Sequence, residues 1–291
     1  GGTVLGSSRG DQPVPIMVDT LVTMGINVLL AVGGDGTLRG AQAIVEEIAR
    51  RDLDIAVIGI PKTIDNDIAY IAQSFGFQTA ASEAQKAVEA AHAEATGAPN
   101  GIGLVKLMGR DSGFIAAYTA LADSRVNFCL VPESQFTLEA LLEALAERLA
   151  DRGHAVIAVA EGAGQDLIAA QRKIDASGNI QHEDIGLFLR EAIRTHFSQR
   201  RVEINLKYID PSYTIRSVPA NAFDSAFCLI LAQNAVHAGM AGMTNMVVGH
   251  WRGEFTHVPI AAAVSHRKKI DPDGWLWNSV IASTGQKDPL V

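Results

Sequence analysis

INVLLAVGGDGTLRGAQAIVEEIARRDLDIAVIGIPK, residues 26–62, reads as a strand, a helix and a second strand. Apolar runs at 26–34 and 54–62 flank an Ala-, Glu- and Arg-rich stretch at 36–52. Two short buried strands joined by a helix form a βαβ unit, and the strands of such a unit lie parallel in one sheet. This stretch therefore predicts an α/β fold built on a parallel sheet.

The same alternation continues along the chain. Further helices are predicted at 75–96, 112–122, 138–153, 185–197 and 222–240, and further buried strands at 101–109, 127–133, 154–162 and 244–251. The polar stretch 162–184 is predicted to be a loop. The pattern indicates a doubly wound architecture in two Rossmann-like lobes with parallel-rich sheets, whose ligands bind at the carboxyl ends of the strands.

Composition narrows the classes of protein and of partner. The 291 residues are 48% hydrophobic and 19% charged, as in ordinary globular proteins, and the net charge is -8. This charge argues against nucleic acid or an anionic membrane as a partner. Cys129 and Cys228 lie in apolar runs and are expected to be buried free thiols of a reducing compartment. No apolar stretch reaches the roughly 18 residues of a membrane span, so a cytoplasmic protein is expected.

The GGDGT motif at 33–37 raises a question of charge. Glycine-rich turns after buried strands commonly bind phosphate through backbone N–H groups, and Asp35 should repel that phosphate. A divalent cation between the carboxylate and the phosphate resolves the conflict, because Mg²⁺ binds one or two carboxylates and completes its shell with phosphate oxygens and water. The alternative is an Asx-turn in which Asp35 caps the following helix.

A second candidate site follows the next strand. PKTIDND at 61–67 places Asp65 and Asp67 two residues apart, after a proline that ends the strand. A carboxylate near a metal-bound phosphoryl group can accept the proton of an attacking hydroxyl. A solvated acidic loop is the alternative for this motif.

Three other strand ends carry groups suited to a phosphosugar. MGRDSG at 108–113 places Arg110 after a glycine, Glu161 follows HAVIAVA, and KYIDPSYTIR at 207–216 contains Lys207, Tyr213 and Arg216. Arginine binds phosphate with two parallel hydrogen bonds, and glutamate accepts hydrogen bonds from sugar hydroxyls. Each group alone could be a surface residue or a helix cap, but together they fit a phosphosugar.

With these motifs the sequence resembles the 6-phosphofructokinase family over nearly its whole length. GGDGT, PKTIDND, MGRDSG, AEG and YTIR occur in the order and at the spacings of that family. GGTVLGSSRG at 1–10 and KYIDPSY at 207–213 resemble most the branch of ATP-dependent enzymes that contains the plant, trypanosomal and related bacterial forms. The resemblance implies the phosphofructokinase fold and phosphoryl transfer from ATP-Mg to the 1-hydroxyl of fructose 6-phosphate, giving fructose 1,6-bisphosphate in glycolysis.

The resemblance also implies roles for individual residues. Asp65 is the general base, assisted by Thr63 and Asp67, and Asp35 is the residue that holds Mg²⁺. The implied nucleotide-binding residues are Arg9, Gly10, Gly34, Asp35, Gly36 and Thr37. The implied substrate-binding residues are Lys62, Thr63, Ile64, Asp65, Met108, Gly109, Arg110, Glu161, Lys207, Tyr213 and Arg216. Lys207 would reach the 6-phosphate bound by a neighbouring subunit, which implies a homo-oligomer, a dimer or a tetramer.

The family pattern also divides the chain. Residues 1–76 and about 213–250 are expected to form the ATP-Mg lobe, and about 77–212 with 251–291 the sugar-phosphate lobe. The first glycine-rich phosphate loop of the family, GGxxPGxN, is not found, so an N-terminal segment is expected to be missing from this chain.

Two residues bear on the identity of the phosphoryl donor, and they favour different donors. Glycine at position 36 leaves room for a nucleotide α-phosphate, whereas diphosphate-dependent relatives carry aspartate there. Lys62, before TIDND, is typical of diphosphate users, but the plant and trypanosomal branch combines it with this glycine and uses ATP. ATP is therefore the expected donor and diphosphate the alternative.

Two other classes of protein fit less well. NAD and diacylglycerol kinases share GGDGT but lack PKTIDND and MGR. A catalytically inactive, metabolite-sensing relative is the remaining alternative, and the intact Asp35, Asp65 and Arg110 argue against it.

Overall fold

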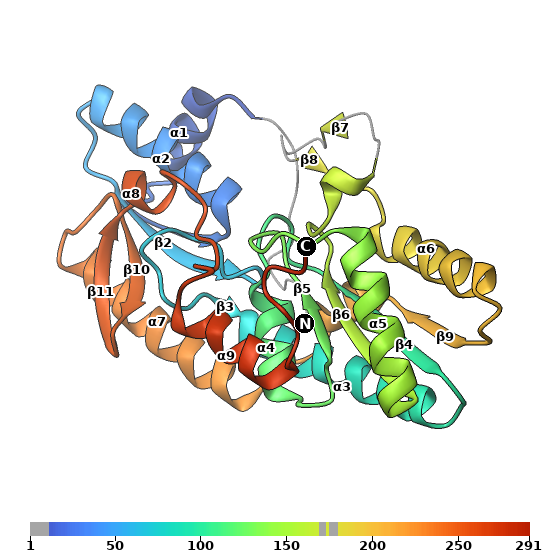
Figure 1. Ribbon diagram of the computed structural model, residues 1–291. Helices are drawn as coiled ribbons and strands as arrows, with labels where there is room; N and C mark the ends of the chain where they lie inside the picture. Colours follow the sequence, from blue (N-terminus) through green and yellow to red (C-terminus); the bar gives the residue numbers. More distant parts are fainter. Residues whose placement is uncertain (1–11, 169–172, 175–179) are drawn as a thin grey trace. The chain divides into compact units, whose positions relative to one another are not determined.

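The computed structural model describes residues 12–168, 173–174 and 180–291 of the 291-residue chain (Figure 1). The predicted nucleotide-binding residues Arg9 and Gly10 lie outside this part. The chain divides into two compact units. Unit 1 ends its first segment at Thr79 and resumes over Pro219–Lys268, and unit 2 contains Ala80–Val218 and Lys269–Val291.

Unit 1 contains one five-stranded sheet in the order β1-β2-β10-β11, with β3 pairing on β2. Its elements are α1 (Val14–Thr23), β1 (Val28–Gly33), α2 (Asp35–Arg50), β2 (Ala56–Thr63), β3 (Phe75–Gly76), α7 (Ala222–Met240), β10 (Met246–Trp251), β11 (Glu254–Pro259) and α8 (Ile260–Ala263). Strand β2 is parallel to β1, β3 and β10, and β11 is antiparallel to β10. Helices α1, α2 and α8 cover one face of the sheet and α7 the other (Figure 1).

The two cores of unit 1 follow from the period of two in a strand. In β2, Val57 packs with Leu38 of α2 on one face, while Ile58 packs with Leu231 of α7 on the other. Both faces of β2 are therefore covered, which explains its continuous apolar run.

Strand β1 differs from the expectation of a buried strand. Among the described residues it pairs with β2 alone, and the side chains of Leu30 and Val32 are exposed. These two side chains point to one face of the strand, whereas Leu29 and Ala31 pack into a core on the other. The prediction of burial was wrong because an apolar run does not reveal whether both faces of its strand are covered. Cys228 is likewise only half-buried, whereas Cys129 is buried, and both thiols are free.

Unit 2 contains a parallel four-stranded sheet in the order β5-β6-β4-β9. Its elements are α3 (Phe77–Thr96, which begins in unit 1), β4 (Gly101–Leu107), α4 (Phe114–Ala122), β5 (Phe128–Leu130), α5 (Leu138–Arg152), β6 (His154–Ala160), η1 (Gln165–Leu167), α6 (Ile185–Gln199), β9 (Asn205–Ile209), η2 (Ser212–Arg216) and α9 (Trp275–Thr284). A short antiparallel pair, β7 (Lys173–Ile174) and β8 (Ile180–Gln181), lies within the stretch predicted to be a loop. Helices α5 and α6 pack on one face of the four-stranded sheet and form its main core.

The second segment of unit 1 ends later than the family pattern suggested. Residues 251–268 belong to unit 1 rather than to the other lobe. The cause is the antiparallel pairing of β10 and β11, which extends from Met246 opposite Pro259 to Trp251 opposite Glu254.

Candidate active site

The GGDGT and TIDND motifs lie next to each other at the carboxyl ends of strands β1 and β2. Strands β1 and β2 are parallel with Gly33 opposite Pro61, so both chains leave the sheet at the same edge. A Cβ atom on Gly34 would lie 3.4 Å from the Cβ of Thr63. The structure therefore brings together the predicted residues that follow these two strands.

Asp35 is an acidic residue in the first turn of α2. Its side chain is 17% exposed, and its Oδ2 lies 3.0 Å from Nε of Arg39. Residue 34 is the N-cap and makes no side-chain capping hydrogen bond. The helix dipole favours a negative charge at this end, so Asp35 is electrostatically supported there without acting as a cap.

The loop after β2 is held by its own polar groups. The N–H of Asp65 donates to Oγ1 of Thr63 at 3.1 Å. Asn66 is buried with a φ of 53°, and its Oδ1 accepts a hydrogen bond from the N–H of Ser74 at 3.0 Å. Asparagine tolerates the left-handed region better than most residues. Asn66 was not among the predicted site residues, although an asparagine between two aspartates is a visible signal in the sequence.

Arg267 lies between the acid at the start of α2 and an acid of the loop after β2. One of its guanidinium nitrogens lies 3.9 Å from Oδ2 of Asp35, and its Nε lies 3.9 Å from Oδ2 of Asp67. Residue 267 also forms an isolated antiparallel bridge with Ile68. Next to it, the Lys268 ammonium donates to the carbonyl oxygen of Ile71 at 2.7 Å. Arg267 was not predicted, because only the fold brings it to the carboxyl ends of β1 and β2.

Asp224 of α7 anchors the chain that pairs with the end of β2. This buried carboxylate accepts hydrogen bonds from the N–H of Gly76 at 3.0 Å and from the N–H and hydroxyl of Thr79 at 2.7 and 2.6 Å. Gly76 in turn pairs with Thr63 across β2 and β3. Asp224 therefore caps the start of α3 and supports the strand next to the TIDND loop.

In unit 2, the predicted substrate residues follow three adjacent strands. Met108, Gly109 and Arg110 come directly after β4, Glu161 after β6, and the segment 210–216 after β9. The chain returns to both sides of β4, since β6 and β9 are its two neighbours. Such a change of direction creates a crevice at the carboxyl ends of the strands, where ligands of doubly wound folds bind.

Glu161 holds the turn after β4 in place. Its Oε1 accepts hydrogen bonds from the N–H groups of Gly109 at 3.2 Å and Arg110 at 2.7 Å. Gly109 has a φ of 147°, and a Cβ atom there would lie 2.5 Å from the carbonyl oxygen of Ser112. The turn thus requires glycine, and Glu161 has a structural task beside the predicted recognition of sugar hydroxyls.

Tyr213 and Arg216 lie together in η2, whereas Lys207 lies apart from them. The guanidinium carbon of Arg216 is 4.7 Å from the ring centroid of Tyr213, within the range of a cation–π contact. Lys207 pairs with Gly103 in the first half of β4, and its ammonium lies 3.9 Å from a carboxylate oxygen of Glu94. Within its own unit, Lys207 does not join the residues at the carboxyl ends of the strands.

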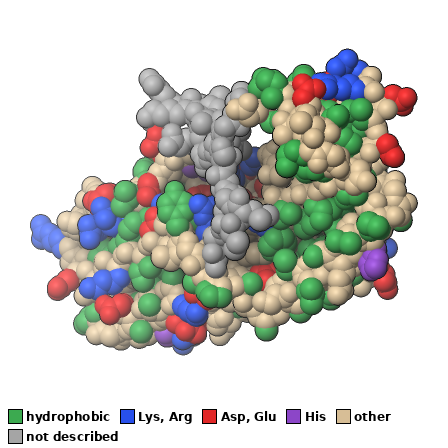
Figure 2. All heavy atoms as spheres, turned by 180° about the vertical axis from the view of Figure 1, so that it is seen from behind, with side chains coloured by type: hydrophobic (Ala, Val, Ile, Leu, Met, Phe, Trp, Pro, Cys, Tyr) green, Lys and Arg blue, Asp and Glu red, His purple; other side chains and the backbone are tan. Residues whose placement is uncertain are grey.

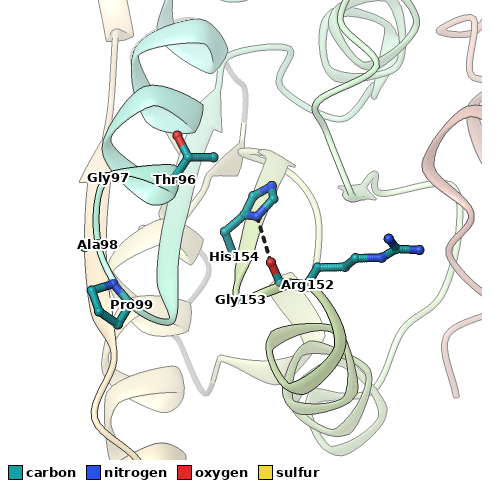
Figure 3. Close-up of a pocket in the computed structure, with 7 residues that line it drawn as sticks. All are labelled: Thr96, Gly97, Ala98, Pro99, Arg152, Gly153 and His154. Carbon is teal, nitrogen blue, oxygen red and sulfur yellow. Dashed lines mark hydrogen bonds between the residues drawn. The ribbon is translucent and has the colours of Figure 1, made fainter.

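A shallow pocket of about 370 Å³ lies at the opposite edge of the unit 2 sheet. It is lined by residues around Gly97 and His154, at the amino ends of β4 and β6, and Nδ1 of His154 lies 3.2 Å from the carbonyl oxygen of Arg152 (Figure 3). This pocket contains none of the predicted site residues.

The described residues also limit metal and membrane binding. Among them, no group of three or more His, Cys, Asp or Glu side chains could hold a metal ion by itself. No helix of this part combines the length and the apolar character needed to cross a membrane. On the face drawn in Figure 2, basic and acidic side chains of the described residues are interspersed.

The fold and these strand-end motifs define the class of doubly wound α/β proteins. The family model described as phosphofructokinase matches residues 1–239. The chain therefore belongs to the phosphofructokinase family, which confirms the resemblance of its motifs. A solved structure of the pyrophosphate-dependent phosphofructokinase from Marinobacter aquaeolei matches 99% of this chain and 74% of its own with a TM-score of 0.77 at 20% identity, which supports the fold.

Two curated relatives are much more similar in sequence. The ATP-dependent 6-phosphofructokinase of Borreliella burgdorferi is 53% identical over 98% of this chain. The ATP-dependent 6-phosphofructokinase 7 of Arabidopsis thaliana is 49% identical, also over 98% of this chain. The chain spans 66% and 60% of the lengths of these two relatives.

Proposed function

We propose that the protein transfers a phosphoryl group from ATP to the 1-hydroxyl of fructose 6-phosphate. The observation that carries this proposal is the meeting of the GGDGT and TIDND motifs in unit 1, where Gly34 lies against Thr63. The similarity to relatives named ATP-dependent 6-phosphofructokinases supports the same activity.

Unit 1 would bind the donor and activate the acceptor. Asp65 is the proposed general base, with Thr63 and Asp67 in support, because a carboxylate next to the transferring phosphoryl group can accept the hydroxyl proton. The backbone and side chains of Gly34, Gly36 and Thr37, at the start of α2, are proposed to bind nucleotide phosphates, as helix N-termini do. The acceptor site would be lined by Lys62, which is exposed near the end of β2, and by Ile64, next to Asp65.

The donor set of unit 1 fits Mg²⁺ that arrives with a nucleotide. Asp35 offers one partly exposed carboxylate, and the described residues contain no cluster of three or more His, Cys, Asp or Glu side chains that could hold a metal ion without a ligand. Mg²⁺ that is bound to phosphates requires only one or two carboxylates from the protein. Asp35 would hold the ion. When bound, Mg²⁺ would neutralise charge on the donor phosphates.

Unit 2 would bind the sugar phosphate. Arg110, Tyr213 and Arg216 are proposed to hold the substrate, with Met108 and Gly109 lining the pocket. Glu161 would use the oxygen that does not hold the turn to accept hydrogen bonds from sugar hydroxyls. Lys207 is proposed to act on a neighbouring subunit of a homo-oligomer, and the cytoplasm is the proposed location.

Diphosphate is the second candidate donor, and Lys62 favours it. An assay coupled to fructose 1,6-bisphosphate formation, with ATP and diphosphate compared at equal Mg²⁺, tests both. We expect turnover with ATP and little with diphosphate. Turnover with diphosphate alone would reverse the choice of donor, and no turnover with either would refute the proposed function.

A further inference from the structure

Lys106 of β4 lies at the centre of a charged network in unit 2. Its side chain is 16% exposed, and its ammonium lies 2.8 Å from Oδ2 of Asp184 and 2.8 Å from Oδ2 of Asp210. The hydroxyl of Tyr208 donates to Oδ1 of Asp184 at 3.1 Å. A single ammonium therefore compensates two carboxylates that would otherwise repel each other.

Each partner of Lys106 fixes a different segment of the chain. Asp184 is the N-cap of α6 and accepts a hydrogen bond from the N–H of Leu187 at 3.0 Å. Asp210 directly follows β9, and its Oδ1 accepts a hydrogen bond from the N–H of Ser212 at 2.9 Å. The network thus ties the end of β4 to the start of α6 and to the start of η2.

The Lys106 ammonium keeps its positive charge within this network. Burial opposes its charge, but the hydrogen bonds to Asp184 and Asp210 outweigh that effect and raise the pKa of Lys106. Burial alone would raise the pKa of Asp184, yet the bond from Lys106 and the N–H of Leu187 lower it. The raised pKa of Lys106 and the lowered pKa of Asp184 both favour the charged forms of this ion pair around neutral pH.

We infer that Lys106 is a positioning residue for the sugar phosphate, an inference that rests on the proposed function. Lys106 lies on β4, two residues before Met108. Through Asp210 it fixes the start of η2, which carries Tyr213 and Arg216. Ile215, which is buried, anchors the other end of this short helix. Lys106 acts through these residues and makes no contact with substrate in this scheme.

The test compares Lys106→Met and Lys106→Arg with the exposed control Lys86→Met, whose ammonium pairs only with Glu83 among the contacts described on α3. We expect Lys106→Met to raise the KM for fructose 6-phosphate about 10- to 100-fold, as small misplacements of binding groups do. The kcat should change less than about 3-fold and the KM for ATP less than about 2-fold, because the proposed donor residues lie in unit 1. Lys106→Arg should restore most of the affinity, and Lys86→Met should match the wild type.

Hydrogen exchange of residues 205–216 gives a readout that needs no activity. Lys106→Met should speed exchange in η2, and Asp210→Asn should reproduce both this change and the higher KM. A Lys106→Met variant with lower thermal stability and kcat but an unchanged KM would show a merely structural role and overturn the inference, as would unchanged exchange in η2. A wild type that does not phosphorylate fructose 6-phosphate would refute the proposed function, while the exchange data would still decide whether Lys106 orders η2.

Discussion

Gly36, in the first turn of α2, is an open position in the proposed nucleotide site. A Cβ atom built on this residue meets no atom within 4 Å, so a side chain fits without disturbing the fold. We expect Gly36→Asp to lower ATP-dependent turnover by orders of magnitude, because its carboxylate would occupy the room proposed for the α-phosphate. Diphosphate has no nucleoside, so its use should persist or emerge. Steady-state rates with both donors provide the measurement.

Gly36→Ala is the matched control for this prediction. The methyl group adds volume without charge, so the variant should keep its fold and most of its ATP activity. An aspartate variant that still uses ATP efficiently would show that Lys62, or a segment outside the described residues, determines the donor.

Asp65 is the residue on which the proposed chemistry depends most. Asp65→Asn keeps the shape of the side chain but cannot accept a proton, and we expect kcat to fall about 10²- to 10⁴-fold with little change in the KM for fructose 6-phosphate. Asp54→Asn, an exposed acid before β2, is the control. Comparable kcat values for the two variants would remove Asp65 from the mechanism.

At the residue scale, the proximity of groups that lie in short motifs at strand ends could be predicted from the sequence. Gly34 and Thr63 belong to separate motifs, yet both follow predicted parallel strands, so their proximity could be expected. Arg267 and Asp224 could not be predicted in this way. Each acts on a loop that is distant in sequence, and that kind of contact depends on which strands pair and which helix covers them.

The contact between α7 and the start of α3 is an element-scale feature with a measurable cost. Asp224→Ala leaves the N–H groups of Gly76 and Thr79 without their carboxylate. Hydrogen bonds to charged groups and helix caps each stabilise by about 1–3 kcal/mol, so we expect the free energy of unfolding to fall by about 2–4 kcal/mol. Urea denaturation measures this loss. Ser225→Ala, at an exposed position of the same helix, should change it by less than about 0.5 kcal/mol, and an equal loss in both variants would contradict the capping role.

Because of Lys268, the stability of unit 1 is expected to vary with pH in the alkaline range. Burial lowers the pKa of Lys268 from 10.5 to about 8, and the carboxylate of Asp67 only partly opposes this. Between these two values the unfolded chain binds more protons than the folded one, so the free energy of unfolding should rise with pH in that window. Lys268→Met should remove this rise. Urea titrations at pH 7.5, 9 and 10 test it, and a constant difference between wild type and variant would exclude Lys268 as the cause.

Helices and strands were predicted well where a long sequence pattern marks them. They were predicted poorly where the pairing of strands determines the structure. The helices α2, α3, α5 and α7 were predicted within a few residues because each has a long periodic or Ala-rich stretch. The exposure of β1 and the presence of β11 were not predicted. Position in a sheet and antiparallel addition to an edge are set by partners, which a single apolar run does not encode.

The two units have separate hydrophobic cores, and this has a consequence for the whole molecule. Leu145 is fully buried in the core of unit 2, and Leu38 is fully buried in unit 1. We expect either leucine-to-alanine change to cost about 2–5 kcal/mol. Hydrogen exchange should speed up mainly in the unit that carries the change. Equal acceleration in both units by either variant would show that they open as one cooperative body.

At the scale of the whole chain, the alternation of strands and helices was enough to predict two doubly wound parts. It was not enough to locate where unit 1 ends. Lys268 closes that unit because β11 folds back on β10, and the sequence of 251–268 carries no helix or strand pattern strong enough to show this in advance.

The pairing of β2 with β10 also has a consequence during synthesis. The ribosome completes Thr63 long before it reaches Met246, and all of unit 2 except its last segment is made in between. At about 5–20 residues per second, β2 is synthesised on the order of ten seconds or longer before β10. Throughout that time β2 can pair with β1 and β3, but the side of the strand at Ile58 and Gly59 that later binds β10 lacks its partner, so nascent chains of this protein expose an apolar strand edge to which molecular chaperones can bind.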